Sequence, residues 1–268
     1  MSLIPSFFKN SVVSIGTRNK EGHVIWTSTG FFVVRRIDQQ NLRPFLITNR
    51  HVFESRNTMV IRMKEKGTEN LKELDVAIID KEGKPLYKLH HNEKIDVAVL
   101  PLNGSYIMSN NLEFPAVNID ENAMTSYELR NAGANEGSIL YMLGFPMGLV
   151  NEHSSEPICR MGCVARISET QITEQQSILI DIQNFPGNSG SPIFTKPEFV
   201  SIEGTPALGK SVLLGIVHSY IPYQESLVNQ QTGNIVEIRS ENSGLAKAHP
   251  VEYIKEIIDL IQPLNNNV

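Results

Sequence analysis

Asn184-Phe-Pro-Gly-Asn-Ser-Gly-Ser-Pro-Ile-Phe194 is the most informative stretch of this 268-residue chain. An apolar run precedes it and another begins at Ser191, which predicts a tight turn between two strands. Gly187 and Gly190 flank Ser189, and glycine adopts backbone conformations that other residues avoid. Such a turn can present the Ser189 hydroxyl and aim successive N–H groups into one pocket. A purely structural Gly/Ser turn is the alternative.

Short apolar or alternating runs recur on both sides of this turn. Val, Ile and Phe are enriched in them and turn residues separate them closely, which is typical of β-strands. Many short strands without helical periodicity between them favour a β-sandwich or β-barrel over a parallel α/β sheet. The predicted strands are 11–15, 23–34, 45–48, 59–63, 96–100, 138–143, 162–167, 177–182, 191–194 and 212–217.

Two segments interrupt the β pattern. Residues 103–136 are polar and irregular, and we expect them to connect two β units. After Pro250, apolar residues recur at helical spacing until Pro263, which predicts a C-terminal helix packed on the β core. The expected organisation is an N-terminal β domain over 8–115, a second β domain over 116–248 and a helix over 249–262.

The composition excludes several classes of protein. With 41% apolar and 20% charged residues, the chain is typical of a globular protein. Its formal net charge of −5 gives no general attraction for nucleic acid or an anionic membrane. No apolar run is long enough to span a bilayer, and the first residues lack the pattern of a secretory signal. We therefore expect a cytoplasmic protein with no nucleic-acid or membrane partner.

Several side chains that could carry chemistry have simpler interpretations. Cys159 and Cys163 are expected to be packed thiols, because C-x3-C spacing lacks the second ligand pair of a zinc site. His90 and His91 are adjacent, and neighbours on a strand point to opposite faces, so no metal site is predicted there. The Arg35-Arg36 pair is predicted to lie at a solvated strand end.

A serine hydroxyl is a poor nucleophile without a base, so a histidine is needed near Ser189. His51 stands out among seven histidines because it follows the apolar run 45–48, at the end of a rigid strand. Asp96 begins another apolar run, where an unpartnered charge is expensive, and a carboxylate there could orient the His51 ring. Each residue alone could be structural, as a satisfied histidine or an exposed strand start. Their combination favours nucleophilic catalysis.

These segments together resemble those of the chymotrypsin-like (trypsin-like) serine proteases. The matching segments, in that family's order, are Thr48-Asn-Arg-His51-Val52, Asp96-Val-Ala-Val-Leu100 and Gly187-Asn-Ser189-Gly-Ser-Pro192. The bacterial branch that includes the HtrA proteases and the glutamyl endopeptidases is more similar still. That similarity lies in Thr29–Val33, Leu46–Asn49, Gly144–Leu149 and Asp181. The resemblance leaves no room in these 268 residues for the PDZ domain of HtrA proteins, so we expect a protease domain without one.

The resemblance implies an all-β fold of two six-stranded antiparallel β-barrels, with an active site in the cleft between them. It implies that Ser189 is the nucleophile, His51 the general base and then acid, and Asp96 the orienting carboxylate. The backbone N–H groups of Gly187 and Ser189 would form the oxyanion hole. No metal or organic cofactor is implied. The expected activity is that of a serine endopeptidase that hydrolyses protein substrates through an acyl-enzyme.

The family's pattern also suggests where a substrate side chain would bind. Gln183, six residues before Ser189, would lie at the base of the S1 pocket, where a neutral amide disfavours Arg and Lys. The opposite wall would come from His218, Ser219 and Tyr220, beside which a peptide would add as a strand. His218 resembles the histidine with which glutamyl endopeptidases and viral 3C-like proteases bind Glu or Gln. It could equally be a bystander, with a small or apolar P1 residue preferred.

Asn188 occupies the position at which digestive family members carry the aspartate that pairs with a newly cleaved N-terminus. Activation by that route is therefore not expected. Control by binding or loop ordering is a hypothesis, with 199–211 and 221–245 as candidate segments and a regulatory protein as a partner that would fit it. The alternatives to an active peptidase are a catalytically silent or latent module that binds peptides or partners, and an esterase.

Overall fold

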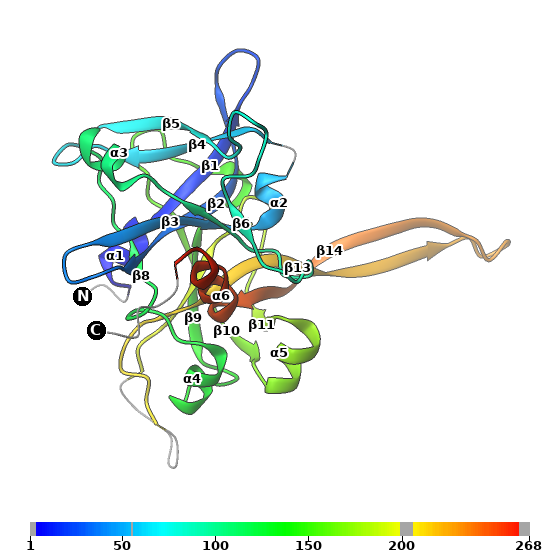
Figure 1. Cartoon of the computed structure of the whole chain (residues 1–268). Helices are drawn as coiled ribbons and strands as arrows, with labels where there is room; N and C mark the ends of the chain where they lie inside the picture. The colour runs from blue at the N-terminus through cyan, green and yellow to red at the C-terminus, as the bar shows by residue number, and fades with distance from the viewer. Residues whose placement is uncertain (1–3, 55, 199–205, 263–268) are drawn as a thin grey trace.

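The computed structural model describes residues 4–54, 56–198 and 206–262, and strands make up most of the regular structure in them (Figure 1). The N-terminal half forms one sheet of order β5-β4-β1-β2-β3-β7-β6, and β8 pairs with β2 in parallel. The strands are β1 (Val12–Arg18), β2 (Val24–Arg36), β3 (Leu42–Thr48), β4 (Thr58–Lys64), β5 (Leu71–Ala77), β6 (Lys88–Leu89), β7 (Ala98–Pro101) and β8 (Val117–Asn118).

The C-terminal half is a closed barrel of order β10-β11-β14-β13-β12-β9, with antiparallel neighbours. This confirms one of the two six-stranded barrels expected from the sequence. The N-terminal unit differs, because it has eight strands and the described residues make no pairing between its end strands β5 and β6. The barrel strands are β9 (Ile139–Gly144), β10 (Ile158–Arg166), β11 (Ile178–Asp181), β12 (Pro192–Thr195), β13 (Leu213–Val228) and β14 (Ile235–Pro250).

The helices are short except for the last one. The predicted C-terminal helix is confirmed, and the segment 103–136, predicted to be irregular, contains two helices and β8. Within the described ranges, no helix combines the length and apolar character that crossing a membrane requires. The helices are α1 (Ser6–Asn10), α2 (Arg50–Phe53), α3 (Gly104–Ser109), α4 (Ser126–Asn131), the 3-10 helix η1 (Pro146–Gly148), α5 (Glu169–Gln175) and α6 (Val251–Ile261).

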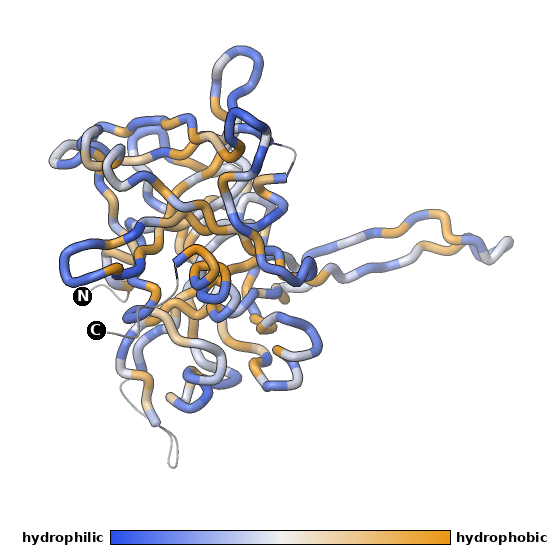
Figure 2. The backbone as a smooth tube through the Cα atoms, in the orientation of Figure 1, coloured by the Kyte–Doolittle hydropathy of each residue, from blue (hydrophilic) through white to orange (hydrophobic). Residues whose placement is uncertain are grey.

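One cluster of buried side chains extends from the N-terminal sheet into the barrel. Phe45 and Val97 contribute to it from the N-terminal half, and Leu143 and Phe194 from the barrel. The buried stripe of α6, which includes Ile254, packs into the same cluster. Figure 2 shows this distribution, with apolar residues concentrated along the inner strands and polar residues along the outer loops. Shared packing of this kind holds the two halves in one relative position.

Arg35 lies in the core, so the prediction that it ends a solvated strand was wrong. Its side chain is 1% exposed and pairs with Asp120 at 3.0 Å and with Asp259 of α6. A guanidinium can be buried when carboxylates pair with it in this way. Arg36 is instead exposed, 3.6 Å from Glu121. The buried pair therefore links β2 to α6.

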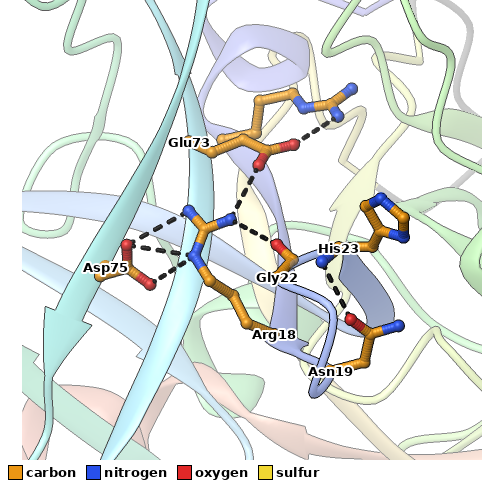
Figure 3. A network of polar contacts seen from close by, with 7 residues as sticks. Arg18, Asn19, Gly22, His23, Glu73 and Asp75 are labelled. Atoms are coloured by element: carbon orange, nitrogen blue, oxygen red, sulfur yellow. Dashed lines mark hydrogen bonds and ion pairs between the residues drawn. The ribbon is translucent and has the colours of Figure 1, made fainter.

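A surface ion-pair network connects the end of β1 to β5. Arg18 binds Asp75 at 2.9 Å, approaches Glu73 and donates to the carbonyl oxygen of Gly22 (Figure 3). Asn19 accepts from the backbone N–H of His23 in the same turn. Exposed pairs contribute little stability individually, so we interpret this network as fixing the β1–β2 turn.

A long hairpin formed by β13 and β14 extends away from the barrel (Figure 1). Its residues pair in one register from Pro222 with Asn242 to Leu227 with Glu237, the register shifts before Val228 pairs with Ile235, and most of its side chains are exposed. The hairpin covers most of 221–245, one of the two segments suggested for control. Residues 199–205 of the other segment lie outside the described residues.

Candidate active site

His51 lies where strand β3 of the N-terminal sheet ends and a short helix begins. β3 ends at Thr48, Asn49 is the N-cap residue, and His51 is in the first turn of α2. The next two residues of α2, Val52 and Phe53, are buried and anchor this turn in the core. The His51 side chain is left 45% exposed at the end of a rigid strand, as the sequence predicted.

Asp96 binds the ring and the backbone of His51. The Asp96 Oδ2 atom lies 2.6 Å from His51 Nδ1, and Asp96 Oδ1 accepts from the His51 backbone N–H at 3.0 Å. Asp96 is itself held by its backbone, since its N–H donates to His249 Nε2 at 3.0 Å and its carbonyl accepts from Asn49 Nδ2 at 2.7 Å. These bonds set the orientation of the imidazole, which is the task of the carboxylate in a catalytic triad.

The pKa of Asp96 reflects two opposing effects. Burial alone would raise it, but the hydrogen bond from the His51 ring, the charge of His51 and the His51 backbone N–H outweigh burial and lower the pKa. Asp96 is therefore a carboxylate at neutral pH and can stabilise a protonated His51.

Two further histidines stack behind Asp96. The rings of His218 and His249 are 3.9 Å apart and nearly parallel. His249 Nε2 accepts the Asp96 N–H, so the proton of neutral His249 is on Nδ1, which donates to the carbonyl of Gln176 at 2.7 Å. Burial lowers the pKa of His218 to about 3 and that of His249 to about 4. Both rings are thus neutral at pH 7.

The buried, neutral rings of His218 and His249 lead us to expect that the protein is less stable in acid. An unfolded chain protonates these histidines near pH 6.5, whereas the folded chain does so only near pH 3 to 4, so stability falls as pH drops below 6.5. Between pH 7 and pH 5 each histidine should lower the free energy of unfolding by about 2 kcal/mol. The His218→Phe variant should lose about half of the pair's contribution, measured by urea unfolding at both pH values.

A matched His23→Phe variant, at an exposed position, controls for loss of a histidine elsewhere. If His218→Phe and the wild type lose the same free energy between pH 7 and pH 5, the neutral buried pair is not the cause of acid sensitivity.

The predicted turn around Ser189 joins β11 to β12 and depends on its two glycines. Gly187 has φ of +97° and Gly190 has φ of +88°. A Cβ at Gly187 would overlap the carbonyl oxygen of Phe145, and one at Gly190 would overlap that of Thr29. Side chains are therefore excluded at both positions by backbone conformation and by space.

The turn leaves two backbone donors free. Asn188 N–H donates to Phe185 and Gly190 N–H donates to Val217. The N–H groups of Gly187 and Ser189 have no acceptor among the residues that the structure describes. Two unpaired donors beside a partly exposed serine match the arrangement expected of an oxyanion hole.

The serine turn is bonded to the sheet that carries His51. Thr29 N–H donates to the Ser189 carbonyl at 2.9 Å, and the Thr48 hydroxyl donates to the Thr29 carbonyl at 2.8 Å. Within the described contacts, however, no hydrogen bond joins Ser189 Oγ to the His51 ring. Such bonds are often long in structures without a substrate.

The residues predicted to line the S1 pocket lie on two segments, one just after β11 and one on β13, and β14 lies between these strands in the barrel. Gln183 is exposed just after β11, and its Nε2 lies near Gly244 of β14. Ser219 and Tyr220 lie on β13, where Ser219 pairs with Lys247. His218 precedes them but is stacked on His249, on the side of Asp96. Their roles in substrate binding stay predictions.

His90, His91 and Glu256 form a cluster with ligand atoms close enough to suggest a metal site. The two rings lie 4.2 Å apart, so the expectation that they point to opposite faces was wrong; β6 ends at Leu89, before them. His90 Nδ1 accepts from the Asn92 N–H, which places the proton on Nε2, 2.7 Å from Glu256. With both ring nitrogens used in this way, His90 has no lone pair for a metal.

A family model described as a trypsin-like peptidase domain matches residues 28–200, which is more than half of the chain. The chain belongs to the trypsin-like peptidase family. The match includes the segments that carry His51, Asp96 and Ser189.

Solved structures that are similar to this trypsin-like peptidase include two proteases. The HtrA-type protease AlgW with decapeptide is 14% identical with a TM-score of 0.48; the match covers 96% of this chain and 66% of AlgW, just under two thirds of its length. The MamO protease domain from Magnetospirillum magneticum, in its apo form, is 12% identical with a TM-score of 0.44, and the match covers 93% of this chain and 96% of MamO. No curated protein sequence matches this peptidase.

Proposed function

We propose that this trypsin-like peptidase is a serine endopeptidase that hydrolyses peptide bonds in protein substrates through an acyl-enzyme on Ser189. The observation that supports it most is the 2.6 Å contact between His51 Nδ1 and Asp96 Oδ2. The free N–H groups of Gly187 and Ser189 add the second requirement, a site that stabilises negative charge.

In the proposed reaction, Ser189 Oγ attacks the carbonyl carbon of the scissile peptide while His51 Nε2 removes the hydroxyl proton. The oxyanion of the tetrahedral intermediate accepts from the N–H groups of Gly187 and Ser189. His51 then gives its proton to the leaving amine, the C–N bond breaks and the acyl-enzyme remains. Water, deprotonated by His51, attacks the ester, and Ser189 regains its proton as the acid product leaves.

The proposed organisation assigns one catalytic role to each half of the chain. Residues 8–115 would carry the base and its carboxylate, 116–248 would carry the nucleophile, and 249–262 would pack on both. A peptide would bind as an added strand beside His218, Ser219 and Tyr220, with its P1 side chain toward Gln183. This pocket would favour an uncharged or acidic P1 residue over Arg or Lys. A bacterial cytoplasm is the expected setting, with a regulatory protein as a further partner.

A latent or catalytically silent peptide-binding module is the second candidate. It is favoured by the absence, among the described contacts, of a hydrogen bond between Ser189 Oγ and His51. In such a protein the cleft would bind peptides without hydrolysing them until a partner or substrate brought Ser189 Oγ within hydrogen-bond distance of His51.

Labelling with a fluorophosphonate probe separates the two candidates. The probe reacts with an activated serine, and intact mass counts the labels on each protein. We expect one label on the wild type and none on Ser189→Ala or His51→Ala. A folded wild type that takes no label would contradict the active enzyme and favour the latent module. Hydrolysis of a peptide library, compared with simple esters, then distinguishes a peptidase from an esterase.

A further inference from the structure

Thr29 is a fully buried residue of β2 that bonds to both halves of the molecule. Its hydroxyl donates to the Gly187 carbonyl at 2.7 Å and accepts from the Phe145 N–H at 3.0 Å. Its own N–H donates to the Ser189 carbonyl, and its carbonyl accepts from the Thr48 hydroxyl. Every polar group of Thr29 is therefore used, and two of its bonds end on the serine turn.

The four carbonyl groups of residues 186–189 in the serine turn each accept a hydrogen bond. In a trans peptide the C=O and N–H groups point in opposite directions, and the described residues contain no cis peptide bond. Fixing a carbonyl therefore fixes the direction of the following N–H. The four bonds are Met147 N–H to the Pro186 carbonyl, Thr29 hydroxyl to Gly187, Ser191 N–H to Asn188, and Thr29 N–H to Ser189.

Gly187 is the residue of this turn at which the backbone can rotate most freely. Its φ of +97° is open to glycine, and its two flanking peptide planes are fixed by different groups. Met147 N–H holds the plane before Gly187, and the Thr29 hydroxyl holds the plane after it. Without the hydroxyl, the second plane, which lies between the two donors, could rotate about Gly187 and take the Ser189 N–H out of line with the Gly187 N–H.

We propose that Thr29 is a positioning residue that keeps the two oxyanion-hole donors aligned with each other, by holding from the opposite half of the molecule the peptide plane that lies between them. This inference rests on the proposed function, because it assigns a role within that site. Thr29 would not touch the substrate. Its hydroxyl would act by holding the Gly187 carbonyl, so that the free N–H groups of Gly187 and Ser189 converge on one point.

The Thr29→Val variant tests this, since it keeps the shape of the side chain and removes the hydroxyl. We expect kcat for peptide hydrolysis to fall about 100-fold with KM near the wild-type value, because an oxyanion donor acts in the transition state. Affinity for a peptide aldehyde, which forms a tetrahedral adduct, should fall in parallel. Thr29→Ser should restore kcat to within a few-fold of the wild-type value. Ser28→Ala is the matched control, because it removes the hydroxyl of a neighbouring buried residue.

Amide NMR shifts of Gly187 and Ser189 give a readout that does not need activity. Both should move in Thr29→Val and stay near wild type in Thr29→Ser. A folded Thr29→Val with unchanged shifts and unchanged kcat would overturn the inference, as would a rise in KM alone. If the shifts move but the wild type neither labels nor hydrolyses peptides, the proposed function fails while the positioning role stands.

Discussion

Replacing Ser189 with alanine is expected to lower kcat for peptide hydrolysis by about 10⁶-fold, the loss found when the nucleophile of another serine protease is removed. The reason is that Ser189 carries the only hydroxyl between Gly187 and Gly190 in the sequence, so the proposed acyl-enzyme could not form. The fold should persist, because the Ser189 hydroxyl makes no hydrogen bond in the described structure, whereas its backbone carbonyl is bonded to Thr29.

The measurement is kcat on a peptide substrate identified by library profiling, together with the melting temperature. Ser105→Ala is the matched control, because it removes an exposed hydroxyl from α3 in the N-terminal half. If Ser189→Ala kept more than a hundredth of wild-type activity, another nucleophile or a directly activated water would have to replace the acyl-enzyme.

Changing Asp96 to asparagine should reduce kcat by about 10⁴-fold, the value known for the equivalent change in the trypsin template. The structure indicates how. Asp96 Oδ1 accepts the His51 backbone N–H, so the amide oxygen of the substituted side chain would take that place and its NH₂ group would face His51 Nδ1. The ring would then carry its proton on Nε2 and could not accept the proton of Ser189.

Kinetics of Asp96→Asn, with KM and melting temperature measured alongside, check this expectation. Asp75→Asn is the matched control, because it removes a carboxylate that pairs with Arg18 on the surface. If kcat of Asp96→Asn stayed within tenfold of the wild-type value, the contact between Asp96 and His51 would not control the His51 tautomer.

Features that depend on neighbouring residues could be predicted from the sequence. The stripe of α6 buries Ile254, Ile257 and Ile258, as its helical spacing indicated. The turn at Gly187 and Gly190 has the positive φ values that paired glycines allow. The contact between His51 and Asp96 spans 45 positions and was predicted from the order of motifs rather than from local pattern.

Features that depend on distant residues could not be predicted in this way. Thr29 binds Gly187 across 158 positions and Asp96 binds His249 across 153, and no local spacing identifies either pair. The prediction that Arg35 ends a solvated strand failed because its carboxylate partners, Asp120 and Asp259, are far along the chain and local sequence does not reveal them. The rings of His90 and His91 lie close together because the chain leaves β6 before them, which alternation along a strand does not predict.

The projecting β13–β14 hairpin has open strand edges, which a closed barrel does not have. Beyond the barrel its strands pair only with each other in the described residues, so each outer edge carries unpaired N–H and C=O groups. An open edge is a template for aggregation with other strands. Pro222 has no backbone N–H to donate on β13, and the charged residues Glu225, Glu237, Arg239 and Glu241 give the hairpin beyond the barrel a net negative charge. Net negative charge on both copies would disfavour edge-to-edge pairing of two hairpins, which lowers the tendency of these exposed strands to associate with each other.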